Sequence, residues 1–388
     1  MTTTSRRLSM SDGGSQPDAF NPGRLRVARE RRGLTKDALA RHCAVSRRAV
    51  TDWEGGRVEA PPIDRIAAAL EFPQSFFVRD DAEDLPADSV SFRALTAMSQ
   101  RQLRKVLANA ALVLEFAGWL DERYRTPAVD IPSIEDLTVS QHESEPSPVD
   151  AAAALRAIWG LGAKPVKDML ALLESRGVYV FGLADDEREV DAFSFWQGGR
   201  PYVFVNVTKS AERVRFDLAH ELGHLCMHRG VPTCRNRRFE LAANIFASAF
   251  LMPSEGLLPQ LTAAPQLVDV LRLKRHWRVS ALAMVRRLHQ LGRLSDWQYR
   301  SWLIDFSRRG YRTSEPDGLA LEQSSLLRQV LTLAREDGWT LPRISRGLGI
   351  PAADLSSALF GLTITPVPAG ARPALPADAG PRPQLRRV

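Results

Sequence analysis

The chain has little cysteine and no long apolar run. Its 388 residues include three cysteines, Cys43, Cys226 and Cys234, which form no CxxC pair and no even set, so disulfide bonds are not expected. No apolar stretch approaches the roughly 20 residues that a membrane-spanning helix needs, and the polar segment 1–18 lacks the hydrophobic region of a signal peptide. These absences argue against a secreted disulfide scaffold and predict a cytoplasmic protein without a membrane partner.

The net charge of +7 is concentrated near the N-terminus. Residues 22–57 hold ten basic and four acidic side chains, a net +6, which is nearly the whole excess. A concentrated basic face is typical of proteins that bind the phosphate backbone of double-stranded DNA. The basic residues are Arg24, Arg26, Arg29, Arg31, Arg32, Lys36, Arg41, Arg47, Arg48 and Arg57.

The same basic segment has the start and stop signals of short helices. Thr35 and Ser46 are suited to cap helices over 36–43 and 47–53, and glycines follow the ends of the neighbouring helices. Only the brief Ala44-Val45 turn separates these two helices, which predicts a helix-turn-helix. A fourth helix over 62–70 and the core residue Trp53 complete the expected all-α domain.

This pattern resembles the phage-repressor-like (XRE/Cro) class, through Gly33-Leu34-Thr35, Leu39-Ala40, Val45-Ser46 and Trp53-Glu54-x-Gly56. The resemblance implies a homodimer that places its third helix in the major groove of a DNA operator. Contacts to DNA would then come from Lys36, Ser46, Arg47, Arg48 and Thr51. The alternative is that Arg47 and Arg48 touch only phosphates or solvent. Two positions depart from the class, since Lys36 stands where Gln is usual and Ala44 where a turn glycine is common.

A second motif, His220-Glu221-x-x-His224, lies in an apolar helical run. Residues four apart share one face of a helix, so both imidazoles can hold one metal ion while Glu221 takes a proton from water. Zinc hydrolases use a third protein ligand. Glu240 is the only acid in the next apolar helix, over 239–252, where an unpaired charge would be costly. A metal ion or a neighbouring arginine, Arg237 or Arg238, would satisfy it.

Residues Arg215 to His228, Glu240-Leu-Ala-Ala-Asn244-x-Phe246-Ala247 and Leu251-Met252-Pro253 resemble the ImmA/IrrE family of metallopeptidases. The likeness covers about residues 150–300. It implies zinc held by His220, His224 and Glu240, with Glu221 as general base and Asn244 ordering a ligand or a helix contact. Manganese is an alternative, because two imidazoles and a carboxylate accept either ion. Members of the family cut helix-turn-helix repressors in response to stress or mobile-element signals.

Three strands are predicted ahead of the metal-binding helix, at 178–182, 191–196 and 202–207, with Gly198-Gly199 as a turn. A substrate strand could add to an edge of this sheet. The expected fold class is α+β multidomain: an all-α helix-turn-helix domain, a mainly helical zincin-like domain with a small antiparallel sheet, and a small helical C-terminal region.

The expected domain order has six parts. They are a disordered N-terminus (1–18), the helix-turn-helix domain (19–80), a helical linker region (81–149), the peptidase domain (150–310), a C-terminal helical region (311–364) and a disordered tail (365–388).

The sequence predicts a DNA-binding regulator that is also a zinc endopeptidase, cutting a helix-turn-helix repressor or itself. The alternative is a transcription factor whose peptidase-like domain only senses a ligand or metal. Tyr202 and His228 are candidates for stabilising the oxyanion of peptide hydrolysis, although a structural role is the simpler expectation for each. A small zinc knuckle formed by Cys226, His228 and Cys234 is a further alternative.

Overall fold

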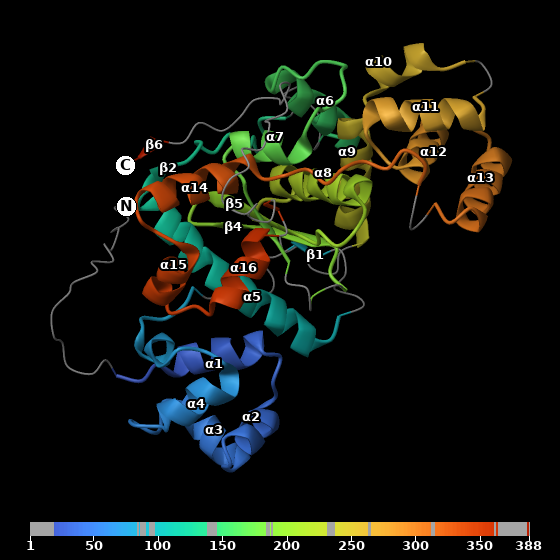
Figure 1. Cartoon of the computed structure of the whole chain (residues 1–388). Coiled ribbons are helices and arrows are strands. Elements are labelled where there is room, and N and C mark those ends of the chain that lie inside the picture. Colours follow the sequence, from blue (N-terminus) through green and yellow to red (C-terminus); the bar gives the residue numbers. More distant parts are fainter. Residues whose placement is uncertain are drawn as a thin grey trace. The chain divides into compact units, whose positions relative to one another are not determined.

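The computed structural model describes residues 19–83, 85, 91–92, 98–137, 146–183, 187, 189–230, 237–262, 265–311, 315–360, 362–363 and 386–387. Cys234 and almost all of the two terminal segments that we expected to be disordered lie outside these residues. The contacts divide the chain into two compact units, Met1–Ala82 and Glu83–Val388, which Figure 1 shows in blue and in teal to red. The finer division into six parts stays a prediction.

The first unit is all-α, as the sequence predicts. It consists of α1 (Pro22–Arg31), α2 (Lys36–His42), α3 (Arg47–Glu54), α4 (Ile63–Leu70) and the 3₁₀ turn η1 (Gln74–Val78). The predicted caps form: the hydroxyl of Thr35 accepts a hydrogen bond from the Ala38 N–H, and that of Ser46 accepts one from the Ala49 N–H. Trp53 is buried in the core.

The turn between α2 and α3 explains the departure at position 44. Ala44 has φ 53°, in the left-handed region that favours glycine. The Val45 N–H donates to the Ala40 carbonyl at 2.9 Å and closes the turn behind it. An alanine therefore holds the conformation in which this class commonly has a glycine, so the turn geometry survives the substitution.

The second unit contains a four-stranded sheet in the order β1-β4-β5-β3. Its strands are β1 (Ser91–Phe92), β3 (Tyr179–Gly182), β4 (Ala192–Gln197) and β5 (Arg200–Val205). The turn Gly198-Gly199 joins β4 to β5 as predicted, and both glycines have positive φ. A second, two-stranded sheet pairs β2 (Tyr124–Arg125) with β6 (Arg386–Arg387), two residues of the predicted tail.

The expectation of an antiparallel sheet is wrong for one pairing. β4 and β5 are antiparallel, but β3 and β5 are parallel, so the sheet is mixed. The reason is that the β4–β5 hairpin folds back with its second strand in the middle, between β4 and β3. Side-chain alternation identifies strands but does not say which strand of a hairpin takes the central place. The rest of the predicted fold class is confirmed.

Helices build the remainder of the second unit. Among them, α8 lies along β4 and β5 and packs against α9, α7 and α6, and α5 packs against α16 (Figure 1). The helices are α5 (Gln100–Asp121), α6 (Pro148–Ile158), α7 (Met169–Ser175), α8 (Ala211–Met227), α9 (Arg237–Leu251), α10 (Ser254–Leu257), the 3₁₀ turn η4 (Leu258–Gln260), α11 (Leu267–Trp277), α12 (Ala281–Gln290), α13 (Asp296–Arg308), α14 (Ser325–Glu336), α15 (Leu341–Leu348) and α16 (Ala352–Phe360).

Among the described helices, none is by itself long and apolar enough to cross a membrane. Only one bent combination, Arg237–Leu251 with Ser254–Gln260 at an angle of 41°, meets the requirement by length and composition. Much of its first helix is buried within the protein, where Phe246 and Phe250 are fully covered.

Buried acids join the C-terminal helices to the core of the second unit. Glu174 on α7 is fully buried and accepts hydrogen bonds from both the N–H and the hydroxyl of Ser325 at 3.0 Å and from the Leu326 N–H at 2.9 Å, at the start of α14. The Ser324 hydroxyl donates to the same carboxyl. Burial raises the pKa of Glu174 to about 7, while these donors oppose that rise.

We predict that Glu174→Ala lowers the free energy of unfolding by about 2–4 kcal/mol, because it leaves buried donors at the start of α14 without their acceptor. Urea unfolding followed by tryptophan fluorescence measures this change. Glu122→Ala, which removes an exposed acid paired with Arg123, is the matched control and should cost less than about 0.5 kcal/mol. Equal losses in the two variants would contradict the role given to Glu174.

Candidate functional site

The HExxH residues lie on α8 and the later acid lies on α9. His220, Glu221 and His224 are buried. The Nε2 atoms of His220 and His224 are 3.1 Å apart, and each lies 3.3 Å from an oxygen of Glu240. The structure therefore brings together three side chains that the sequence separates by up to 20 positions.

Gly223 sets how closely the two helices approach. A Cβ atom at this position would lie 3.0 Å from the Phe246 ring and 3.4 Å from the Cα of Ala243, both on α9. A methyl group here would force the Phe246 ring or α9 to shift by a few tenths of an ångström, and a larger side chain would need more room. The glycine inside the motif is thus needed for packing, since it lets Glu240 reach the histidines.

The donor set fits a divalent metal ion. Neither Glu240 oxygen accepts a hydrogen bond from the described residues, although each lies within ion-pair distance of an imidazole. The ligand atoms of His220, His224 and Glu240 lie within 4.8 Å of one another. Two ligands at about 2.0–2.2 Å from a tetrahedral zinc ion are themselves about 3.4 Å apart, close to the separations found here. Buried nitrogen and oxygen donors at this spacing are suited to zinc.

The protonation of these groups agrees with a ligand role. Burial alone would raise the pKa of Glu240, but the neighbouring His220 and His224 hold it well below its usual value. Burial and the nearby His224 lower the pKa of His228 to about 3. The site therefore presents an ionised carboxylate and, one turn beyond His224, a neutral imidazole.

Glu221 is positioned by the sheet. The Ser194 hydroxyl on β4 donates to Oε2 of Glu221 at 2.6 Å, and both side chains are buried. Sequence reasoning missed Ser194. The available signal was a serine between two aromatic residues, Phe193 and Phe195, in a strand whose other positions are apolar at its centre. A polar side chain buried in such a strand needs a partner, which here is the candidate general base.

His228 and Asn244 support the two ligands rather than reaching toward a substrate. The Nδ1 atoms of His228 and His224 are 3.0 Å apart, so one proton is shared between them. If Nε2 of His224 binds a metal ion, Nδ1 carries the ring proton and donates it to Nδ1 of His228, which would fix the ring of His224. The Asn244 amide donates to the backbone carbonyl of Glu240 at 2.7 Å. Both contacts orient candidate metal ligands or their helix.

Two other residues considered from the sequence lie in the core. Tyr202 packs in an aromatic cluster, with ring centroids 5.6 Å from Tyr179 and 5.4 Å from Phe195. Cys226 is fully buried, and burial raises the pKa of its thiol well above the usual value. Among the described residues, Cys226 belongs to no group of side chains placed to hold a metal ion; since Cys234 lies outside them, the zinc knuckle stays a prediction.

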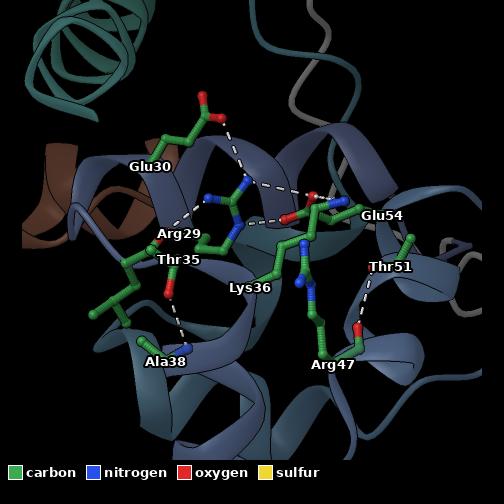
Figure 2. Close-up of polar contacts among 9 residues, drawn as sticks. Arg29, Glu30, Thr35, Lys36, Ala38, Arg47, Thr51 and Glu54 are labelled. Carbon is green, nitrogen blue, oxygen red and sulfur yellow. Dashed lines mark hydrogen bonds and ion pairs between the residues drawn. The ribbon is translucent and has the colours of Figure 1, made fainter. Parts of the chain in front are cut away.

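In the first unit, Glu54 joins the helices of the predicted DNA-binding motif. Figure 2 shows its carboxylate between Arg29 of α1 and Lys36 of α2, at 2.5 Å and 3.0 Å. Arg29 also donates to the Leu34 carbonyl at 2.8 Å. Lys36, one of the predicted DNA contacts, therefore links α2 to α3 through its ion pair with Glu54. Contact of Lys36 with DNA stays a prediction.

The other predicted DNA contacts lie on α3 or cap it. Arg47 and Arg48 are exposed, 3.7 Å from Asp37 and 3.8 Å from Asp52 respectively. The Ser46 hydroxyl caps the helix, and the Thr51 hydroxyl donates to the Arg47 carbonyl at 3.1 Å (Figure 2). Each arginine therefore has one long ion pair at the surface, whereas both hydroxyls have partners within α3.

The exposed basic surface is smaller than the sequence count indicates. Arg24, Arg29 and Arg31 are buried, and Arg24 lies over the Phe76 ring while bonding the Asp80 carbonyl at 2.6 Å. These arginines hold the domain together instead of facing solvent. The exposed members of the basic set are Arg26, Arg41, Arg47, Arg48 and Arg57.

Comparison with protein families identifies both parts of the chain. Residues 23–74 match a family model described as a helix-turn-helix domain, and residues 173–289 match one described as an IrrE N-terminal-like domain. The chain thus carries a helix-turn-helix domain followed by an IrrE N-terminal-like domain, the combination that the resemblance implied. No curated protein matches the chain significantly.

We predict that Glu54→Gln destabilises the first unit by about 2 kcal/mol, because it removes the nearer of the two carboxylates, Glu54 and Glu30, that pair with the buried Arg29 guanidinium. Thermal unfolding followed by circular dichroism measures the loss. Glu59→Gln, an exposed acid in the same unit, is the matched control and should change stability by less than about 0.5 kcal/mol. A neutral outcome for Glu54→Gln would show that this ion pair does not support the helix-turn-helix.

Proposed function

We propose that this protein is a DNA-binding transcriptional regulator whose second unit is a zinc-dependent endopeptidase. The observation that carries the proposal is the convergence of His220, His224 and Glu240 beside Glu221, whose carboxyl is held by Ser194. Their types and separations suit a hydrolytic metal centre. The helix-turn-helix domain supports a DNA operator as the first partner.

Each residue of the site has a part in peptide hydrolysis. A zinc ion held by His220, His224 and Glu240, or manganese in its place, would polarise the scissile carbonyl and acidify water. Glu221 takes the proton of the attacking water and passes it to the nitrogen of the leaving amine. Ser194 keeps the Glu221 carboxylate in one orientation through its 2.6 Å hydrogen bond. His228 does the same for the ring of His224.

The substrate that we propose is a helix-turn-helix repressor or the chain itself, cut in a cytoplasmic response to stress or to a mobile element. The regulator would act on its operator as a homodimer, since helix-turn-helix domains read paired half-sites. The second candidate function is a transcription factor whose peptidase-like unit only senses a ligand or metal. The buried, positioned Glu221 favours the enzyme, because sensing needs the metal ligands but no general base.

Substitution of Glu221 separates catalysis from metal binding. Glu221→Gln should keep zinc at the wild-type stoichiometry and abolish cleavage of purified helix-turn-helix repressors and of unfolded casein, because the proton acceptor is lost. Glu240→Gln should lower zinc affinity by more than the roughly 10–100-fold typical of a supporting residue. Elemental analysis measures the zinc, and gel electrophoresis measures the cleavage. A zinc-loaded wild type that cuts none of these proteins would favour the sensor.

The DNA-binding proposal is tested at α3. Arg48→Ala should weaken binding to duplex DNA and reduce the slope of log K against log salt by about one if it contacts a phosphate. Fluorescence anisotropy at several salt concentrations measures both quantities. Arg65→Ala on α4 removes another exposed arginine, which lies outside the helix-turn-helix pair, and should leave affinity unchanged. Equal effects of the two substitutions would indicate attraction by total charge and not by α3.

A further inference from the structure

The outer edge of β4 is occupied by a segment of the same chain. In the sheet order β1-β4-β5-β3, β5 covers one edge of β4 and β1 covers the other (Figure 1). β1 consists of Ser91–Phe92, which follow the helix-turn-helix unit in sequence and precede α5. A segment near the start of the second unit thus lies where an extended peptide would add to this sheet.

The register places this segment beside the candidate general base. β1 runs antiparallel to β4, with Ser91 opposite Ser194 and Phe92 opposite Phe193. Ser194 is the residue whose hydroxyl bonds Glu221 at 2.6 Å. Neighbouring strands are about 4.8 Å apart. The Ser91 backbone therefore lies one strand spacing from the residue that holds the general base of the proposed peptidase.

Contacts on both sides of β1 follow the same antiparallel order. Before it in sequence, Glu83 accepts a hydrogen bond from Gln197 at the end of β4. After it, Gln102 donates to Glu189, which precedes β4. As the sequence advances from 83 through 91 and 92 to 102, the contacted positions run backwards, from 197 through 194 and 193 to 189. This ordered series supports β1 as a docked extended segment.

Peptides recognised by strand addition owe much of their affinity to main-chain hydrogen bonds, and this edge offers them next to Glu221. We propose that the segment at Ser91–Phe92 is a substrate of this site and that the chain cuts itself there. This inference rests on the proposed peptidase function. Because substrate and site belong to one chain, the reaction is intramolecular and its rate does not depend on protein concentration.

The reaction is a hydrolysis and needs no other reactant than water. The oxygen of water bonds to the carbonyl carbon of Ser91, and the bond from this carbon to the nitrogen of Phe92 breaks. Glu221 takes one proton from the water and delivers it to that nitrogen. The products are a new carboxylate at Ser91 and a new amine at Phe92. Cleavage therefore separates the DNA-binding unit from the rest of the chain.

Self-cleavage is tested with the zinc-loaded full chain and its Glu221→Gln variant. Intact-mass spectrometry should show the wild type splitting between Ser91 and Phe92, with a first-order rate constant that stays the same over about a tenfold dilution. Glu221→Gln should remain whole. Ser91→Ala keeps the backbone N–H and should be cut, whereas at least one of Ser91→Pro and Phe92→Pro should resist cutting because a strand hydrogen bond is lost.

Hydrogen exchange supplies a readout that needs no catalysis. In metal-free Glu221→Gln, the amides of β4 should exchange slowly, and the more disruptive of the two proline substitutions should speed their exchange at least about tenfold. The added Ser91→Ala substitution should not. Unchanged β4 exchange in both proline variants would show that β1 does not cover this edge and would overturn the proposal.

The experimental outcomes distinguish self-cleavage from the proposed peptidase function on which it rests. If the wild type digests unfolded casein while its own chain stays intact, the peptidase stands and self-cleavage is wrong. Cuts only at other positions, or a rate that rises with protein concentration, would likewise overturn it. If the zinc-loaded protein cuts neither casein, repressors nor itself, the proposed peptidase function fails and the self-cleavage fails with it.

Discussion

The close packing of α8 against α9 is the constraint on which the candidate metal centre depends. Two histidines on one helix and a glutamate on another must place their donor atoms within about one ligand–ligand distance of each other. Gly223 makes this approach possible, because Phe246 and Ala243 occupy the space that a side chain would fill. The sheet then completes the site from the other side, where Ser194 of β4 holds Glu221. The packing that forms this part of the fold therefore also forms the site.

Buried charges serve a similar purpose in both units. In the first unit, Glu54 joins α3 to Arg29 and Lys36 on two other helices. In the second, Glu174 on α7 holds the start of α14, and the buried Arg215 of α8 pairs with Glu322 just before that helix. Removing one partner of such a pair costs more than the pair contributes, because a charge or donor is left buried alone. These contacts specify which helices must pack together.

The start of the second unit in sequence lies against the sheet that carries Ser194. Glu83, β1 and Gln102 contact β4 or the residue before it in antiparallel order, and β1 lies opposite the residue that holds Glu221. Under the proposed peptidase function, hydrolysis at β1 would detach the helix-turn-helix unit from the rest of the chain without a separate signalling surface. Strand addition suits this coupling, since it depends on backbone groups that any segment carries.

The sequence by itself determined the features that arise between near neighbours. Helical spacing put His220 and His224 on one face, the capping roles of Thr35 and Ser46 were readable from residue type, and Gly198-Gly199 marked the hairpin. Each depends on backbone geometry over a few residues. Glu240 was recognisable because it was the only acid in an apolar helix, although its approach to the histidines was not visible.

Only the tertiary structure decided the features that depend on distant partners. It made β3 parallel to β5, gave Glu221 its hydrogen bond from Ser194, engaged Lys36 with Glu54, and buried arginines that a charge count assigns to the surface. Residue type and local spacing state what a side chain can bind. Which partner it meets is settled by the packing of helices and strands far apart in sequence, because burial makes each polar group find a partner among whatever surrounds it.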